Sequence, residues 1–386
     1  MDLISIFTEN KETVYKAFKF QLNLTEEQTT AVNKQIGCSR YVYNWALNEK
    51  SKIYAETKEN VSCFELGKRL TQLKKEVEWL NDVQAQTLQM ALRNLDNAYT
   101  NFFKKKGNFP KFKSKKDSVQ SFSYPQNVKV KDNKVFLPKI GWCHYYKHRD
   151  IVGTIKTVTV RRTSTGKYFI SILCDTKIPK PEKVEIKEST TVGLDLGIKT
   201  LVVTSDGEMF ENQRHFLKLQ KRLRVEQRSL RRKFTKENKS KNYLKQKLVV
   251  AKIYEKITNQ RKDYLNKIST QLIKEYDTIC IEDLNVSGMM KNSKLAKHIQ
   301  DCAWYSFRTM LEKKSEEYGK NLIVIPRFAP SSKRCNSCGH INKIKLSDRE
   351  FNCQSCNTLL NRDFNAAQNI KDYGLGIKPF IVNAEH

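Results

Sequence analysis

The sequence lacks any run of about 18 apolar residues, the length that a membrane-spanning helix requires. Its amino-terminal stretch, MDLISIFTENKETV, is acidic and polar, so it does not have the pattern of a secretory signal peptide. The six histidines are scattered, and none lies near an acid-bearing strand end, which disfavours a histidine-dependent hydrolase. These absences predict an intracellular protein of the cytoplasm or nucleoid, with no membrane partner.

Acidic residues are few relative to basic ones. The chain of 386 residues has 71 Lys and Arg against 41 Asp and Glu, a formal net charge of +30. Such a charge repels itself unless the working partner is a polyanion, and aromatic residues interleave with the basic ones, as is typical of nucleic-acid-binding proteins. A merely lysine-rich composition is the alternative. The hydrophobic content of 39% is enough for two or more packed units.

The ten cysteines do not form a disulfide framework, because six are single and four stand in two tight pairs. The pairs CNSC and CQSC are separated by residues 339–352, the spacing of a zinc ribbon with four thiolate ligands on two short hairpins. Redox chemistry is the alternative, but it needs one such pair at a helix start. We predict one structural Zn²⁺ held by Cys335, Cys338, Cys353 and Cys356.

The first half of the chain predicts a small β-barrel interrupted by helices. YKAFKFQLNL alternates like a strand, and Thr25 with Gln28 forms a capping box that begins a region of helical spacing reaching about residue 103. Two later segments, NVKVKDNKVFLP and TVTVRRTSTGKYFISILCD, each carry a hairpin signal. We expect residues 1–24 and 106–182 to form a barrel closed by the first strand, with residues 25–105 as a helical insert.

The segment KKKGNFPKFKSKKDSVQSF joins the helical insert to the later strands. Gly107 and Pro110 break the helix, which should expose the neighbouring phenylalanines among lysines. Lys111 and Lys113 are therefore candidate nucleic-acid contacts, and a solvated linker is the alternative.

A second, α/β unit is expected to begin near Thr190, after the Pro-rich and charged segment KIPKPEKVEIKEST. Its apolar strand in VGLDLGIKT carries Asp195, and the strand in YDTICIEDLNVSG ends at Glu282 and Asp283. Side chains of a strand alternate, so one of these last two acids should face a site and the other should face away. Asp363 opens the helix DFNAAQNI, where its side chain can cap the helix.

Three acids from distant segments predict one divalent-metal site, because a buried strand does not carry an unpaired charge. Carboxylates are the ligands that Mg²⁺ prefers, and two Mg²⁺ ions about 3.5–4 Å apart supply what phosphodiester hydrolysis needs. We therefore expect Asp195, Glu282 and Asp363 to hold two catalytic Mg²⁺ ions. A salt-bridged or turn aspartate is the alternative for Asp195.

Residues 214–274 predict a basic helical hairpin, with apolar residues at helical spacing and cations between them. One sign of charge dominates, which favours contact with phosphates over a merely solvated face. The candidate contacts on the first arm are Lys221, Arg222, Arg224, Arg228, Arg231, Arg232 and Lys233.

The chain resembles the TnpB proteins of insertion sequences, which are relatives of the miniature type V CRISPR effectors. The resemblance rests on four motifs that occur in this order: VGLDLGIKT, IEDLNVSGM, SSKRCNSCGH through CQSC, and NRDFNAAQNI. The resemblance extends to KAFKFQLNLTEEQ, SRYVYNWAL and FPKFKSKK and so covers nearly the whole chain. It implies an RNA-guided endonuclease that cleaves double-stranded target DNA beside a short motif, with Asp195, Glu282 and Asp363 as catalytic acids. Guide RNA and target DNA are the implied partners.

The resemblance also implies a domain layout. Residues 1–24 and 106–182 would form an oligonucleotide-binding-type wedge barrel, and residues 25–105 a recognition insert. Residues 190–334 and 357–373 would form an RNase H-like RuvC nuclease, interrupted by a zinc ribbon at 335–356 and followed by a tail at 374–386. Gln84, Gln86 and Gln89 are candidates to read base edges in the adjacent motif, because glutamine can bind a base bidentately. Polar positions on a helix surface are the alternative.

Two other functions remain open from the sequence. One is an unguided transposase or junction resolvase with the same acids, which the resemblance disfavours and RNA copurifying with the protein would exclude. The other is a guide-directed, nuclease-dead repressor, which the presence of all three acids disfavours.

Overall fold

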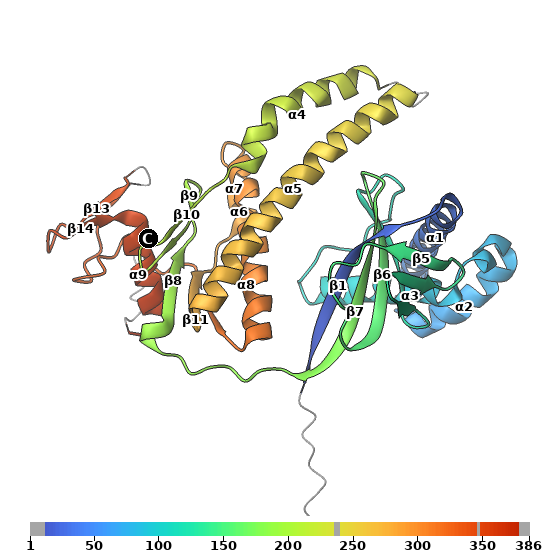
Figure 1. The fold of residues 1–386 in the computed structure, drawn as a ribbon, viewed down its shortest axis with the longest axis horizontal. Coiled ribbons are helices and arrows are strands. Elements are labelled where there is room, and N and C mark those ends of the chain that lie inside the picture. Colours follow the sequence, from blue (N-terminus) through green and yellow to red (C-terminus); the bar gives the residue numbers. More distant parts are fainter. Residues whose placement is uncertain (1–11, 235–239, 346–347, 378–386) are drawn as a thin grey trace, which may run out of the picture. The chain divides into compact units, whose positions relative to one another are not determined.

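The computed structural model describes residues 12–234, 240–345 and 348–377. It divides into two compact units, Met1–Pro179 and Lys180–His386, which are described separately (Figure 1). None of the helices in these described ranges is both long and apolar enough to cross a membrane.

The first unit contains a seven-stranded sheet in the order β2-β6-β7-β1-β5-β4-β3. Strand β1 lies in the middle, where it pairs antiparallel with both β7 and β5. The sequence predicts a barrel closed by this first strand. In the described residues the sheet instead ends at β2, which pairs with β6, and at β3, which pairs with β4, and these two end strands do not pair with each other. The strands are β1 (Thr13–Asn23), β2 (Val119–Tyr124), β3 (Lys129–Lys131), β4 (Lys134–Leu137), β5 (Gly141–Tyr145), β6 (Thr154–Thr163) and β7 (Tyr168–Pro179).

One hydrophobic core explains why this sheet curls. Alternate residues of the strands are buried, and Phe122 from β2 and Val135 from β4 belong to the same core as Phe20 from the central strand. Side chains near the two ends of the ladder can share a core only if the sheet bends around it. The two predicted hairpins are confirmed as the antiparallel pairs β3–β4 and β6–β7, with positive φ at Asp132 and Gly166 in their turns.

Helices between β1 and β2 make up most of the rest of this unit. They are α1 (Glu26–Thr57), α2 (Cys63–Glu76), the 3₁₀ helix η1 (Glu78–Asp82) and α3 (Ala85–Phe103). The capping box is confirmed, because Thr25 Oγ1 accepts from the Gln28 amide and the Gln28 side chain accepts from the Thr25 amide. The loop after α3 exposes Phe109 and Phe112, as predicted, with 51% and 62% of their surfaces accessible.

The second unit has a five-stranded sheet in the order β10-β9-β8-β11-β12. Strands β8 (Thr191–Asp195), β11 (Thr278–Glu282) and β12 (Asn321–Ile325) are parallel, while β9 (Thr200–Thr204) and β10 (Met209–Glu211) add an antiparallel edge. The 3₁₀ helix η2 (Glu188–Thr190) leads into β8.

The two faces of this sheet are covered by different helices. Val192 and Ile279 face one side and pack with residues of α5 (Lys241–Glu275) and α8 (Trp304–Tyr318). The other side is covered by α9 (Arg362–Gly374), which packs against Cys280 through Ile370. Because strand side chains alternate, this arrangement fixes which acids face α9. Short helices α6 (Val286–Met289) and α7 (Ala296–Cys302) lie between β11 and α8.

Helices α4 (His215–Arg232) and α5 form the predicted helical hairpin and run side by side (Figure 1). Leu223 of α4 packs with Val250, Ile253 and Ile257 of α5. The predicted bend covers residues 235–242, of which 235–239 lie outside the described residues.

The cysteine-rich segment lies between β12 and α9 and contains the antiparallel strands β13 (Glu350–Asn352) and β14 (Leu359–Asn361) (Figure 1). Most of the predicted tail, from residue 378 on, lies outside the described residues. Helix α9 approaches β8 so closely that a Cβ atom at Gly193 would lie 2.1 Å from the Ala367 carbonyl oxygen. Glycine at position 193 therefore lets the helix lie directly on the strand.

Candidate functional site

Asp195 and Glu282 stand next to each other at the carboxyl ends of two parallel strands. Leu194 of β8 pairs with Ile281 of β11, so the residue that follows each of them lies at the same edge. The same alternation that turns Gly193 and Cys280 toward α9 turns both acids toward that helix. The sheet register thus brings together two acids that are far apart in the sequence.

Asp363 comes from the first turn of α9, but it does not cap the helix as the sequence had suggested. The N-cap is Asn361, whose Oδ1 accepts from the amides of Asp363 and Phe364 at 2.9 and 3.1 Å. Asparagine and aspartate are both favourable N-cap residues, and in this helix the Asn361 side chain accepts the hydrogen bonds from the first backbone amides. The Asp363 carboxylate therefore has no capping role and accepts from the Arg362 guanidinium at 3.0 Å.

The three acids form one electrostatic cluster. Burial raises the pKa of Asp195 well above its usual range, and the Glu282 and Asp363 carboxylates raise it further, while Arg362 opposes them. Burial also raises the pKa of Glu282, although the Ser331 hydroxyl donates a hydrogen bond to its carboxylate. Carboxylates in such a position favour a bound cation or proton.

Asp283 is the acid that faces away. Asp283 is two residues after Ile281 and so lies on the same face as that residue, toward α8. There its two carboxylate oxygens accept from Arg308 and Arg327 at 2.9 and 2.7 Å. Although burial opposes its ionisation, these salt bridges hold the pKa of Asp283 below its usual value. Of the two neighbouring acids, Glu282 is thus clustered with other carboxylates and Asp283 is paired with arginines.

A cavity of about 710 Å³ opens at Asp195 and Asp363. Its wall also carries six basic side chains, from Lys199, Arg214, Lys333, Lys345, Arg349 and Arg362. Leu196 and Trp304 line both this cavity and a neighbouring one of 360 Å³ that contains Glu282. A cavity lined by both acids and cations suits a phosphate backbone bridged by metal ions.

The four cysteines of the two predicted pairs meet in space. Their sulfur atoms all lie within 4.8 Å of one another, with Cys335 and Cys356 at 3.7 Å and Cys338 and Cys353 at 3.5 Å. Each pair stands on a turn: the bridge between Arg334 and Ile341 closes one, and the β13–β14 hairpin closes the other. Four convergent sulfurs fit a tetrahedral Zn²⁺ and leave no open coordination position.

Backbone and side-chain donors support these sulfurs. Although burial opposes ionisation of Cys353, the amides of Cys356 and Ser355, together with the thiols of Cys338 and Cys356, lower the pKa of its thiol to about 6. Asn342, which is buried, donates from its side chain toward the Cys353 sulfur at 3.7 Å and accepts from the Gln354 amide at 2.9 Å. Donors around metal-binding sulfurs orient them and stabilise the thiolate.

The ligand atoms of the four cysteines lie closer together than those of the three acids. Within the described residues, the cysteine cluster is the one group of three or more His, Cys, Asp or Glu whose ligand atoms all lie within 4.8 Å. The Glu282 and Asp363 carboxylates are near enough to raise the pKa of Asp195, but the oxygen atoms of the three acids do not all lie within that distance. Their oxygen donors still match the chemistry of Mg²⁺, which completes its coordination with waters and phosphate.

The predicted nucleic-acid contacts lie on several surfaces. All seven cations chosen on the α4 arm are exposed, while Leu223 of that arm is buried. Gln84 and Gln86 are half-buried at the start of α3, and Gln89 is exposed. Lys111 is exposed, and the Lys113 Nζ lies 3.9 Å from the centre of the Tyr43 ring, so Lys113 also has a packing role.

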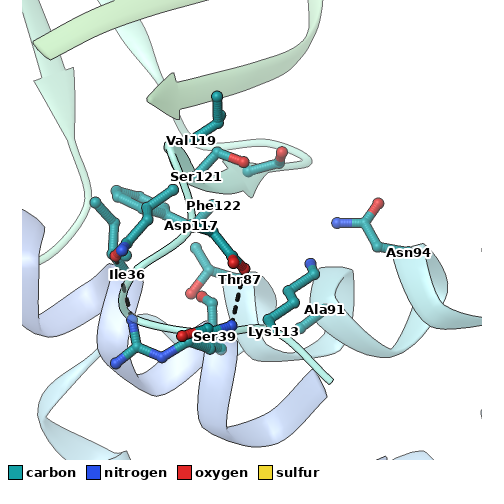
Figure 2. A pocket seen from close by; sticks show the side chains of 14 residues that line it. Ile36, Ser39, Thr87, Ala91, Asn94, Lys113, Asp117, Val119, Ser121 and Phe122 are labelled. Carbon is teal, nitrogen blue, oxygen red and sulfur yellow. Dashed lines mark hydrogen bonds between the residues drawn. The ribbon is translucent and has the colours of Figure 1, made fainter. Parts of the chain in front are cut away.

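Figure 2 shows a pocket of about 180 Å³ in the first unit, between α1, α3 and the start of β2. Ser39, Thr87, Lys113 and Phe122 are among its lining residues. The Ser39 hydroxyl is buried and finds no hydrogen-bond partner in the described part of the chain. The pocket thus offers polar groups beside the helix that begins with the candidate glutamines.

Sequence reasoning missed Ser331, Arg362 and the basic wall of the larger cavity. A partial signal was present, because Lys199 follows the first acidic motif, Lys333 precedes the first cysteine pair and Arg362 directly precedes Asp363. Ser331 gave no signal, since its role depends on a contact with a residue 49 positions away.

Comparisons with known proteins agree with these features. A family model described as "Probable transposase" matches residues 172–293, a "Cas12f1-like, TNB domain" model matches residues 304–370, and a "Helix-turn-helix domain" model matches residues 14–59. A solved Cas12f1–sgRNA–target DNA complex contains a chain with the same fold, at a TM-score of 0.55 and 15% identity, covering 93% of this chain and 99% of that one.

Two curated relatives are much closer in sequence. A Streptomyces pristinaespiralis protein named "Putative RNA-guided DNA endonuclease" is 37% identical, with 95% of this chain and 93% of that protein covered. The Escherichia coli K12 protein "Putative RNA-guided DNA endonuclease InsQ" is 36% identical, with 92% and 91% covered. With this identity along nearly its full length, and with the matching family models, the chain belongs to the TnpB family.

Proposed function

We propose that this chain is an RNA-guided endonuclease that hydrolyses double-stranded target DNA beside a short recognised motif. The observation that carries the proposal is the convergence of Asp195, Glu282 and Asp363 from two strand ends and a helix start. Burial and mutual repulsion make this cluster costly unless cations neutralise it. Relatives named as RNA-guided DNA endonucleases support the substrate and the guide.

In this proposal, Asp195, Glu282 and Asp363 bind two Mg²⁺ ions. When bound, such a pair activates water as the nucleophile and stabilises the leaving oxygen of a phosphodiester. Ser331 orients Glu282 through the hydrogen bond to its carboxylate. Arg362, held against Asp363 on the cavity wall, is placed to contact a phosphate oxygen of the substrate.

The cations around the cavity bind and orient the DNA strand. Lys199 and Lys333 line the same cavity as Asp195 and Asp363, so a strand bound by these lysines would lie near the two acids. The exposed cations of α4 extend the positive surface and would bind phosphates of the guide or of the guide–target duplex. One Zn²⁺ at the cysteine cluster serves as a structural ion.

The first unit is proposed to bind the guide RNA and the motif beside the target. In this assignment the wedge comprises residues 1–24 and 106–182, the recognition insert 25–105, and the RuvC-like nuclease 190–334 and 357–373 around the ribbon at 335–356. Gln84, Gln86 and Gln89 lie at or near the start of α3, where amide groups could meet base edges. The pocket of Figure 2 is lined by Thr87 and Ala91 of the same helix. Lys111 and Lys113 lie on the adjoining loop.

The test begins with the RNA that copurifies with the protein. That RNA is sequenced, its variable end is replaced with a chosen sequence, and the complex is given plasmid libraries with the matching target and randomised flanks. We expect Mg²⁺-dependent cleavage only of matched targets beside one flanking motif. Cleavage that ignores the guide, or a protein without RNA, would instead support the unguided transposase or resolvase.

A further inference from the structure

Three asparagines join the cysteine ribbon to α9. Asn365 Oδ1 accepts from the Asn336 amide at 2.9 Å, and its Nδ2 donates to the Arg334 carbonyl at 2.8 Å. Asn369 Nδ2 donates to the carbonyls of Ser331 and Arg334 at 2.8 and 2.7 Å, and its Oδ1 accepts from Asn336 Nδ2 at 3.3 Å. Asn336 and Cys335 are consecutive, so these bonds hold the start of the first cysteine turn.

The two helical asparagines are placed as a pair. Asn365 and Asn369 are four residues apart and so lie on the same face of α9, and neither side chain is exposed. Asparagine is a poor residue for a helix interior, and a buried amide without partners costs about 1–3 kcal/mol. Here each amide is used as both donor and acceptor, which is consistent with a specific role for the polar contact.

The bonds connect the ribbon to two of the three acids. Asn365 lies two residues after Asp363 in the first turns of α9. Ser331 accepts from Asn369 through its carbonyl and donates to Glu282 through its hydroxyl. A continuous path of hydrogen bonds thus runs from the first cysteine turn to α9 and on to β11.

We propose that Asn365 and Asn369 are positioning residues that set the separation of Asp363 and Glu282. They fasten residues Ser331 to Asn336 onto α9, so the folded ribbon determines where the first turn of α9 lies. The consequence for cleavage rests on the proposed nuclease function, whereas the structural coupling does not. The other possibility is ordinary packing, in which the asparagines only stabilise the fold.

Three variants and one control separate these possibilities. Asn369→Asp keeps the size of the side chain but turns a carboxylate toward two carbonyl oxygens, and Asn365→Leu removes both of its bonds. Asn336→Ala removes the side-chain bonds to Asn369 and Asp372 but keeps the backbone bond to Asn365, so both helical asparagines retain partners. Gln368→Leu is the control, since this neighbouring amide on α9 has none of these contacts to the ribbon.

The first measurement is the Mg²⁺ concentration for half-maximal cleavage of a matched target by the guide-loaded protein. We expect it to rise by roughly 10–100-fold in Asn369→Asp and Asn365→Leu, the loss typical of partners that orient metal ligands, and by less in Asn336→Ala. The zinc content and the guide RNA content of the three variants should equal those of the parent and of Gln368→Leu. Parent-like Mg²⁺ dependence in all three variants would overturn the proposal.

Amide hydrogen exchange tests the coupling without any cleavage assay. In the parent, zinc chelation should accelerate exchange in residues 362–369, and Asn336→Ala with zinc bound should already exchange faster there than Gln368→Leu. Unchanged exchange in this segment, in both the chelated parent and Asn336→Ala, rejects the proposed coupling between the ribbon and α9. A parent that never cleaves rejects the nuclease function alone, because the exchange result still decides the coupling between the ribbon and α9.

Discussion

The acidic cluster and the cysteine cluster bring distant ligands together in different ways. The four cysteines lie within residues 335–356 and meet through two local turns. The acids lie at positions 195, 282 and 363 and meet through the register of β8 with β11 and the packing of α9 on the sheet. The cysteine site therefore depends on local folding, whereas the acidic site depends on the whole second unit.

The two clusters also differ in their charge. Hydrogen bonds lower the pKa of Cys353 and Cys356. Although the His340 backbone opposes the shift, the neighbouring thiols raise the pKa of Cys338. Hydrogen bonds within the cysteine site therefore favour thiolates at some of its sulfurs. Burial and neighbouring carboxylates instead raise the pKa of Asp195, so the acidic site opposes its own ionisation. A site of the first kind favours stability with a structural ion, and one of the second kind is typical of function at a cost in stability.

The largest expected effect is the loss of an acid. Asp195→Ala or Asp363→Ala should reduce guide-directed cleavage by at least about 10³-fold, or roughly 4 kcal/mol of transition-state stabilisation. Binding of RNA and target DNA should persist, because the exposed cations are unchanged. Cleavage gels and a binding assay with the same target measure both. Cleavage near the parent rate would remove that acid from the proposed site.

The loss of a cysteine should have a smaller effect, because it acts on the acids only through the fold. Cys335→Ser or Cys353→Ser should abolish zinc binding, unfold the ribbon and lower cleavage by roughly 10–100-fold. Elemental analysis and cleavage rates measure this. Cys63→Ser, at a single cysteine of the first unit, is the control. Fully active protein without zinc would show that the two clusters are independent.

The basic hairpin should contribute affinity rather than chemistry. Changing Arg228, Arg231, Arg232 and Lys233 together to Gln should flatten the slope of log affinity against log salt by up to roughly three units on duplex, and less on single strands. Cleavage should recover at low ionic strength, where the remaining cations suffice. Salt titrations of binding measure the slope. Unaltered affinity and slope would mean that α4 presents only a solvated face.

The smallest expected effect is on stability, and it has the opposite sign. Without divalent ions and at alkaline pH, above the raised pKa of Asp195, Asp195→Asn should raise the unfolding temperature by roughly 2–4 °C, because it removes one charge from a buried cluster of like charges. Asp283→Asn, which breaks two salt bridges, should leave it unchanged or slightly lower. Thermal unfolding of both variants in a chelating buffer tests the contrast. A loss of stability in Asp195→Asn would mean that the cluster is not strained.

Some of this arrangement could be predicted from residue patterns. Cysteine spacing predicted the cysteine cluster, because its geometry is local. Apolar strands that end in acids predicted the positions of Asp195 and Glu282, because parallel strands share an edge. The helical hairpin followed from the apolar spacing of α4.

The choice of the α9 cap and the contacts made by long-range packing could not be predicted. Asn361 rather than Asp363 caps α9. Both are good capping residues, so only the backbone geometry decides which of them takes this position. The position of β1 in the middle of its sheet reflects pairing with strands more than 100 residues away. The contacts of Ser331, Asn365 and Asn369 join segments that show no shared pattern.

The most direct test of the account uses two adjacent acids with opposite surroundings. Glu282 lies with Asp195 and accepts from Ser331, while Asp283 is paired with Arg308 and Arg327 on the other face. Glu282→Gln and Asp283→Asn each remove one charge from consecutive positions. Single-turnover cleavage of a matched target should fall at least about 10³-fold in Glu282→Gln and stay near the parent rate in Asp283→Asn. The reverse result, or equal rates in both variants, would contradict the proposed acidic site.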